Sequence, residues 1–182
     1  NFMLKKFKDK DFLGIIKSLN LLNLKDFENF IKLLKIIKKK NKKIIIVGNG
    51  GSAAMASHVA VDFTKTSQIR SINFNESDLI TCFANDYGYE NWLKEALKAY
   101  ATKGDLLILI SSSGNSKNII NAGIQGKKMG IKIVTFTGFS SNNKVKKIGN
   151  INFWVNNKTY NIVEITHQSW LLAAVDFLSI KK

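Results

Sequence analysis

The sequence contains no proline, one cysteine (Cys82), one arginine (Arg70) and two histidines (His58 and His167). A single cysteine excludes a disulfide within the chain and is typical of a reducing compartment. No uninterrupted apolar run approaches the roughly 18 residues of a membrane-spanning helix, and no segment resembles a signal peptide. We therefore expect a cytoplasmic protein that has no membrane partner.

The positive charge is large, but lysine carries nearly all of it. The formal net charge is +15, and the lysines are spread over predicted helices. Proteins that read nucleic acids rely on arginine for bidentate contacts, so this pattern does not predict a nucleic-acid partner. A positive field would still attract a small anionic substrate. The 182 residues, 45% of them hydrophobic, predict a single folded domain over residues 1–182.

The stretch KIIIVGNGGSAAMASHVAVDF, residues 43–63, organises the chain. Its apolar run at 44–47 predicts a short buried strand. Gly48, Gly50 and Gly51 then allow a sharp turn, and Ser52 opens a predicted helix. Free N–H groups and the positive end of a helix make such a turn an anion site. The spacing matches neither a Walker A loop nor a dinucleotide fingerprint, so a plain tight turn remains an alternative.

A second stretch, DLLILISSSGNS at residues 105–116, repeats this plan. A buried strand at 106–110 leads into a turn of serines around Gly114, and a helix is predicted over 117–129. Short hydroxyl side chains beside backbone N–H groups suit a phosphate, although serines also form ordinary turns. Two turns of this kind together predict a phosphate or sugar-phosphate ligand.

The rest of the chain alternates strands and helices. Strands are predicted at 71–74, 132–137 and 151–155, a helical turn at 78–83, a polar turn at 85–90, and helices at 91–100 and 162–180. Strands that alternate with helices indicate a parallel sheet covered on both faces. Ligands of such sheets bind at the carboxyl ends of the strands, where both small-residue turns lie.

Residues 1–40 read as two helices separated near 20–25, because their apolar residues recur at helical spacing. These residues carry more apolar side chains than one face of a sheet requires. They form either a covering layer on the domain or a subunit interface. We favour the interface, which divides the domain into an oligomerisation segment (1–40) and an α/β core (41–182).

Two helices carry the residues for chemistry. His58 and Asp62 are four residues apart and share a helix face, a spacing that suits a metal pair, an acid/base pair or a purely structural contact. Glu164, His167 and Gln168 cluster in the same way on the last helix. A site shared by both histidines is therefore a hypothesis. Asp86, in the polar turn, is either a turn residue or a carboxylate directed into the site.

The motifs GNGGSAA with its following histidine, SSSGNS and NDYGYE, in this order, resemble the sugar isomerase (SIS) domain and its phosphoheptose isomerase branch. The resemblance implies a flavodoxin-like three-layer α/β sandwich with a five-stranded parallel sheet. It also implies a homotetramer with the N-terminal helices in its core and active sites between subunits. The implied reaction is the isomerisation of sedoheptulose 7-phosphate to D-glycero-D-manno-heptose 7-phosphate, for heptoses of surface glycans.

The same resemblance implies the site residues. Catalysis would use Asp62, His167 and Asp86, and a zinc ion, if one binds, would use His58, Asp62 and Glu164. The residues expected to hold the sugar phosphate are Asn49, Gly51, Ser52, Asn85, Ser111, Ser112, Ser113, Ser116 and Glu164.

Two positions depart from the family pattern. Asp62 stands where the family has a proton-transferring glutamate, and Leu172 stands where it has a histidine. Leucine cannot transfer a proton or bind a metal. Two further hypotheses therefore stand beside the isomerase: a SIS enzyme for another sugar phosphate, and a non-catalytic protein that binds a sugar phosphate as a regulator.

Overall fold

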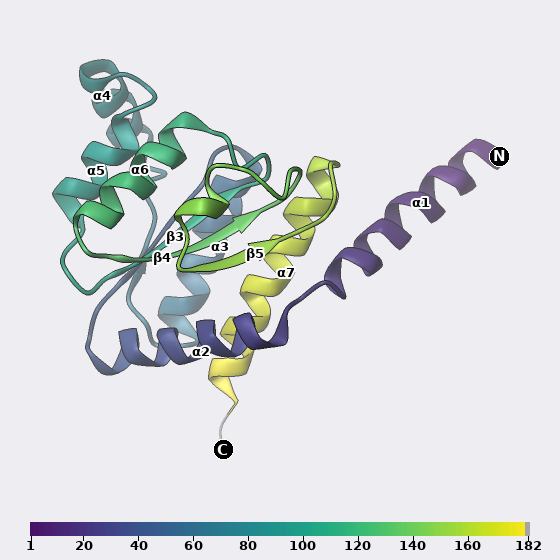
Figure 1. Ribbon diagram of the computed structural model, residues 1–182, viewed down its shortest axis with the longest axis horizontal. Helices are drawn as coiled ribbons and strands as arrows, with labels where there is room; N and C mark the ends of the chain where they lie inside the picture. Colours follow the sequence, from purple (N-terminus) through teal and green to yellow (C-terminus); the bar gives the residue numbers. More distant parts are fainter. Residues whose placement is uncertain (181–182) are drawn as a thin grey trace.

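The computed structural model describes residues 1–180, which form a sheet between two layers of helices (Figure 1). The helices are α1 (Phe2–Leu19), α2 (Leu24–Lys39), α3 (Gly51–Lys65), α4 (Ser77–Tyr87), α5 (Trp92–Tyr100), α6 (Lys117–Lys128) and α7 (Tyr160–Ser179), with a 3₁₀ turn η1 (Lys146–Ile148). The strands are β1 (Ile44–Val47), β2 (Ser71–Ile72), β3 (Leu106–Ser111), β4 (Lys132–Thr137) and β5 (Ile151–Trp154).

The five strands are all parallel and lie in the order β2-β1-β3-β4-β5. Every residue of β1 and β3 is buried, because helices cover both faces of the sheet. Successive residues of a strand point to opposite faces, so Ile44 and Ile46 pack on one side and Ile45 and Val47 on the other. This arrangement confirms the predicted three-layer α/β fold.

The two helical layers enclose separate cores. Helices α2, α3 and α7 cover one face, where Phe30, Phe63 and Trp170 are among the large buried side chains. Helices α5 and α6 cover the other face, around Trp92 and Leu97. Within residues 1–180, no helix combines the length and apolar character that a membrane crossing requires.

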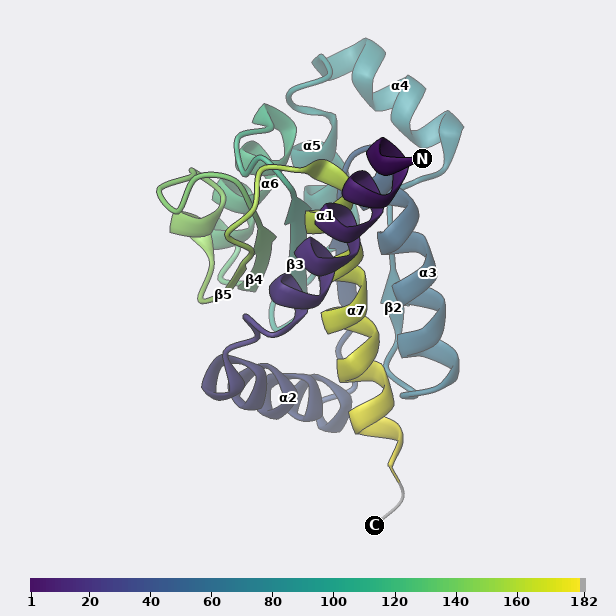
Figure 2. The same ribbon diagram turned by 90° about the vertical axis from the view of Figure 1, so that its right-hand side faces the viewer.

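The first helix stands partly outside the body of the molecule. Helix α1 extends away from the sheet in Figure 1 and lies across α7 in Figure 2. The indole Nε1 of Trp170 donates a hydrogen bond of 3.1 Å to the carbonyl oxygen of Leu19, which anchors the end of α1. The predicted break between two N-terminal helices is present at residues 20–23.

The NDYGYE segment differs from the predicted polar turn. Asn85, Asp86 and Tyr87 form the last turn of α4, and the turn begins only at Gly88. Gly88 has a φ of 80° and its N–H donates to the carbonyl oxygen of Ala84, as glycine does when it ends a helix. The strand at 71–74 is also shorter than predicted, since only Ser71 and Ile72 pair with β1.

Candidate active site

The two small-residue turns lie side by side at the carboxyl ends of neighbouring strands. The turn at 48–51 follows β1 and the serine turn at 111–116 follows β3. From β1 the chain passes to β2 on one side, and it then returns to β3 on the other. Ligands of open parallel sheets bind where the strand order reverses in this way, so the fold places a binding crevice between these turns.

A cleft of about 310 Å³ opens between the turns. One wall comes from the β1 turn and the start of α3, a second from the serine turn, and a third from α7. Its lining residues are Asn49, Gly50, Gly51, Ser52, Ile110, Ser111, Ser112, Ser113, Ser116, Tyr160 and Glu164. The structure thus brings together every residue expected to hold the sugar phosphate except Asn85.

Local geometry fixes the shape of the serine turn. Gly114 has a φ of 65°, which glycine adopts without steric cost, and a Cβ there would collide with the side chain of Asn143. Its N–H donates to Ser111, to the carbonyl oxygen at 2.9 Å and to Oγ at 3.2 Å. The Oγ of Ser112 is buried and has no partner among the described residues. Ser112 lines the cleft, but its Oγ has almost no accessible surface, so a ligand reaches this hydroxyl only if the side chain rotates.

Both helices that start at the cleft present their positive ends to it. Helix α3 begins after Gly50 and helix α6 after Ser116, and neither end has a side-chain cap. The first N–H groups of a helix lack partners inside the helix, and the dipole adds about half a positive charge there. Two such ends beside hydroxyl groups form a site for an anion such as a phosphate.

Glu164 lies directly against the start of α3. A Cβ at Gly51 would collide with the carboxylate of Glu164, so a larger residue at this position would displace that carboxylate. A carboxylate accepts hydrogen bonds and repels a phosphate. The cleft therefore has an anion-binding side at the serine turn and an acceptor side at Glu164.

His58, Asp62 and Gln168 form a hydrogen-bonded group on the adjoining faces of α3 and α7. The Nε2 of His58 lies 3.2 Å from the Oδ2 of Asp62, and its Nδ1 lies 2.9 Å from the Nε2 of Gln168. The amide of Gln168 can only donate through this atom, so Nδ1 is the acceptor and Nε2 carries the proton toward Asp62. The side chain of His58 is 51% exposed.

His167 does not join this group. Its exposed fraction is 0%, and its Nε2 donates to the carbonyl oxygen of Thr137 at 3.0 Å. Burial lowers the pKa of His167 to about 4, against the smaller opposing effect of the bond to Thr137. The imidazole is neutral near pH 7 and does not line the cleft. The structure thus opposes the catalytic role expected for His167, because no substrate can reach the buried ring.

Asn85 and Asp86 also lie away from the cleft of their own chain. Both are exposed on α4, where the amide of Asn85 donates to the carboxylate of Asp86 at 3.0 Å. Neither lines the cleft, and in Figure 1 α4 protrudes from the body of the molecule. The expected role of these two residues at the sugar is therefore not supported within a single chain.

The expected zinc ligands do not form a metal site. Among residues 1–180, no group of three or more histidine, cysteine or acidic side chains could hold a metal ion. Asp62 and Gln168 already occupy the two ring nitrogens of His58, and Glu164 lies at Gly51 instead. These donors do not fit zinc within one chain.

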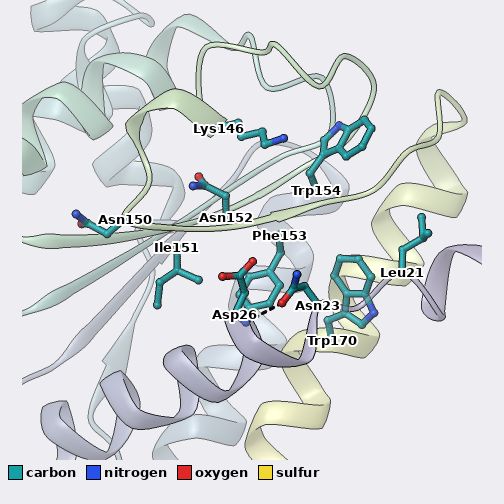
Figure 3. A pocket seen from close by; sticks show the side chains of 10 residues that line it. All are labelled: Leu21, Asn23, Asp26, Lys146, Asn150, Ile151, Asn152, Phe153, Trp154 and Trp170. Carbon is teal, nitrogen blue, oxygen red and sulfur yellow. Dashed lines mark hydrogen bonds between the residues drawn. The ribbon is translucent and has the colours of Figure 1, made fainter.

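A hollow at the edge strand β5 differs from this cleft. It measures about 400 Å³ and lies between β5 and the start of α2 (Figure 3). Asp26 lies in its wall, and the ammonium of Lys146 lies 4.8 Å from the ring centroid of Trp154. None of the residues that line it is a serine or a glycine. It therefore lacks the turns of small residues that line the cleft between β1 and β3.

Local sequence did not predict two residues of the site, Tyr160 and Asn118, and it placed a third, Gln168, in the cluster on the last helix without a role. Tyr160 lines the cleft, Gln168 pairs with His58, and Asn118 pairs with Asn49. Gln168 had a signal, namely its place one turn beyond Glu164. Nothing in the local sequence distinguishes Asn118 or Tyr160 from other polar residues at a helix start.

Comparison with known proteins agrees with this geometry. Residues 11–138 match the SIS domain family, and the chain belongs to it. Several of its relatives are named phosphoheptose isomerases. It is 40% identical over 130 residues to that of Sulfurimonas denitrificans, covering 68% of this chain and 66% of the relative. It is 36% identical over 148 residues to that of Fusobacterium nucleatum, covering 79% and 76%.

A solved structure has the same fold. The phosphoheptose isomerase of Neisseria gonorrhoeae superposes with a TM-score of 0.88 over 96% of this chain and 98% of that chain. The sequence identity in this comparison is 23%, so the similarity concerns the fold. It confirms the five-stranded SIS architecture that the motifs implied.

Proposed function

We propose that this chain is a phosphoheptose isomerase that converts sedoheptulose 7-phosphate to D-glycero-D-manno-heptose 7-phosphate for surface-glycan heptoses. The observation that carries the proposal is the cleft between two helix N-termini, which is lined by the serine turn and the glycine turn. The phosphate binds at the serine turn, since that side offers N–H and O–H donors. Hydroxyl groups of the sugar meet the acceptor side at Glu164.

The reaction moves a proton between C1 and C2 through an enediol, which requires a base at the carbon and an acid at the oxygen. Asp62 is the proposed base, since it is 31% exposed and adjoins a proton-bearing histidine. His58, held by Gln168, orients this carboxylate. The shorter aspartate requires the sugar to approach α3 more closely than a glutamate would.

The proposed active site forms between copies of the chain. Ser52 and Asp62 are ten residues apart on α3, which separates them by about 15 Å along the helix axis. That separation exceeds the distance from the phosphate to C1 and C2 of a seven-carbon sugar. One chain therefore supplies the phosphate cleft and another supplies Asp62. The exposed apolar side chains of α1, among them Phe2, Met3, Leu4 and Phe7, support a homotetramer built on this helix.

Two observations favour the non-catalytic alternative. Leu172, at the position of an expected proton carrier, packs against the core, and His167 is buried. A chain without proton transfer would still bind a sugar phosphate in the serine cleft. The exposed free thiol of Cys82 supports a reducing compartment such as the cytoplasm for either function.

Incubation with sedoheptulose 7-phosphate, with detection of the aldose product, tests the proposed reaction. We expect turnover by the wild type. Ser116→Ala should weaken binding of the sugar phosphate by about 1 kcal/mol or more, the contribution of a hydrogen bond to a charged group. Binding without turnover on any heptose, hexose or pentose phosphate would establish the regulator instead.

Sedimentation of a chain that lacks residues 1–16 tests the proposed assembly, because this truncation leaves α2 in place over the sheet. If α1 forms the subunit core, the truncated chain should be monomeric, and it should lose turnover. A well-behaved tetramer from this truncation would contradict the assembly.

A further inference from the structure

Asn118 is a buried polar residue that lies outside the phosphate cleft. It belongs to the first turn of α6, and only 2% of it is exposed. Its side chain crosses from the β3 side of the sheet to the β1 turn, where it meets Asn49. Burial of a polar amide costs free energy unless its hydrogen bonds are made. The hydrogen-bond partner of Asn118 therefore indicates its role.

The two asparagines form a closed pair of hydrogen bonds. The Nδ2 of Asn49 donates to the Oδ1 of Asn118 at 3.0 Å, and the Nδ2 of Asn118 donates to the Oδ1 of Asn49 at 2.8 Å. Each amide uses one N–H and one lone pair in this contact. Both bonds form only when the two amides face each other in one orientation. The pair therefore fixes the direction of the N–H and the lone pair that Asn49 does not use in this contact.

Asn49 is the residue through which this pair reaches the ligand. Asn49 lines the cleft, and its backbone carbonyl oxygen accepts from the N–H of Ser52 at 3.0 Å. After pairing, the amide of Asn49 keeps one N–H and one acceptor site for other groups. The pair also ties the β1 turn to the start of α6, which directly follows the serine turn.

We propose that Asn118 is a positioning residue for substrate binding. It holds the amide of Asn49 in the orientation that meets a ligand hydroxyl, and it fixes the spacing of the two turns that bind the sugar phosphate. The inference rests on the proposed function for the identity of the ligand. The pairing itself depends only on the two amides.

Asn118→Asp distinguishes positioning from a general structural role. An ionised carboxylate at 118 accepts from Asn49 but cannot donate back, so one of its oxygens faces the Oδ1 of Asn49. A protonated carboxyl has an O–H donor and restores both bonds. The neighbouring charged or titratable groups are Tyr89, Glu90 and Lys117, which line the adjoining hollow. Lys117 and Glu90 form an ion pair of 3.4 Å with each other.

Two control variants separate the pair from simple charge. Asn118→Leu removes the pair at every pH and adds no charge. Asn142→Asp adds the same charge to an exposed loop outside the cleft and leaves the pair intact, since the backbone N–H of Asn142 bonds to Ser140 instead.

The experiment measures KM and kcat for sedoheptulose 7-phosphate from pH 8 to pH 5, each divided by the wild-type value, with calorimetry of inorganic phosphate in parallel. At pH 8 we expect Asn118→Asp and Asn118→Leu to raise KM about tenfold, with a smaller change in kcat. As the pH falls, KM of Asn118→Asp should return toward the wild type, whereas KM of Asn118→Leu should not.

Several results would overturn the proposal. Wild-type KM values in both folded Asn118 variants would do so, as would an equal, pH-dependent loss in Asn142→Asp. Failure of the isomerase proposal would appear differently, as absent turnover in the wild type. In that case the calorimetry still tests the pairing, because the affinity of Asn118→Asp for inorganic phosphate should return toward the wild-type value as the pH falls.

Discussion

His58 and His167 lie on neighbouring helices, α3 and α7, in opposite surroundings. The side chain of His58 is 51% exposed and faces a carboxylate, whereas His167 is fully buried and faces a backbone carbonyl. The ring of His167 also packs edge-on against Phe136. Residue type is the same in both places, so the difference in their chemistry comes from desolvation and partners.

This difference assigns separate tasks to the two histidines. His58 can orient or exchange a proton with Asp62, because water and ligands reach it. His167 instead fastens α7 to the end of β4 through Thr137. The Oγ1 of Thr137 accepts from Asn143 at 3.1 Å, and Asn143 lies against Gly114 of the serine turn. The buried histidine therefore supports the phosphate cleft from behind.

The largest expected effect is a loss of turnover when Asp62, the partner of the exposed His58, is changed. Asp62→Asn keeps the shape of the side chain and removes the base, so turnover should fall by roughly 100-fold to 10,000-fold with little change in substrate binding. Steady-state kinetics provides the measurement, and Asp176→Asn, at an exposed acid of α7, is the control. Unchanged turnover in Asp62→Asn would assign this carboxylate a structural role.

The next largest effect is a loss of folding stability at acid pH that comes from the buried His167. Because folding lowers the pKa of His167 from 6.5 to about 4, the unfolded chain binds a proton in this interval and the folded chain does not. The stabilisation is complete above pH 6.5 and is lost as the pH falls toward 4, by up to about 3 kcal/mol. Denaturant unfolding at several pH values measures this slope.

Asp105 complicates the acid end of that curve. Hydrogen bonds from Lys43 and Thr102 lower the pKa of Asp105 despite the opposing effect of its burial, which is the largest single contribution. Its stabilisation is also lost at acid pH, below the range in which His167 acts. The slope between pH 6.5 and 4 should therefore flatten in His167→Gln and persist in His58→Gln. Equal slopes in both variants would contradict the assignment to His167.

The smallest effect is the direct cost of each substitution near pH 7. His167→Gln should lower the free energy of unfolding by about 1–3 kcal/mol, since it disturbs a buried hydrogen bond and its packing. His58→Gln should cost less than about 1 kcal/mol, as expected for an exposed contact. Chemical denaturation of both variants tests the comparison, and a larger cost at His58 would reverse it.

Local sequence was sufficient for most of the fold. The run of apolar residues at 44–47 and the one from Leu106 form strands because β-branched and leucine side chains fill both cores. The backbone turns at Gly50 and Gly114 with positive φ values, which glycine adopts without strain. The prediction failed in NDYGYE, where Asn85 and Asp86 complete a helix that Gly88 ends. Polar residues such as Asn85 and Asp86 occur both in the last turn of a helix and in a loop, so residue type alone does not locate the end of the helix.

The sequence by itself determined the two turns, their hydroxyl groups and the strands that precede them, because these depend on short-range backbone preferences. Only the tertiary structure decided the environment of each side chain. It buried His167, joined Gln168 to His58 across two helices, and paired Asn118 with Asn49 over 69 positions of the chain. Burial and long-range hydrogen bonds depend on how helices pack on the sheet, and a local pattern of residues carries no record of that packing.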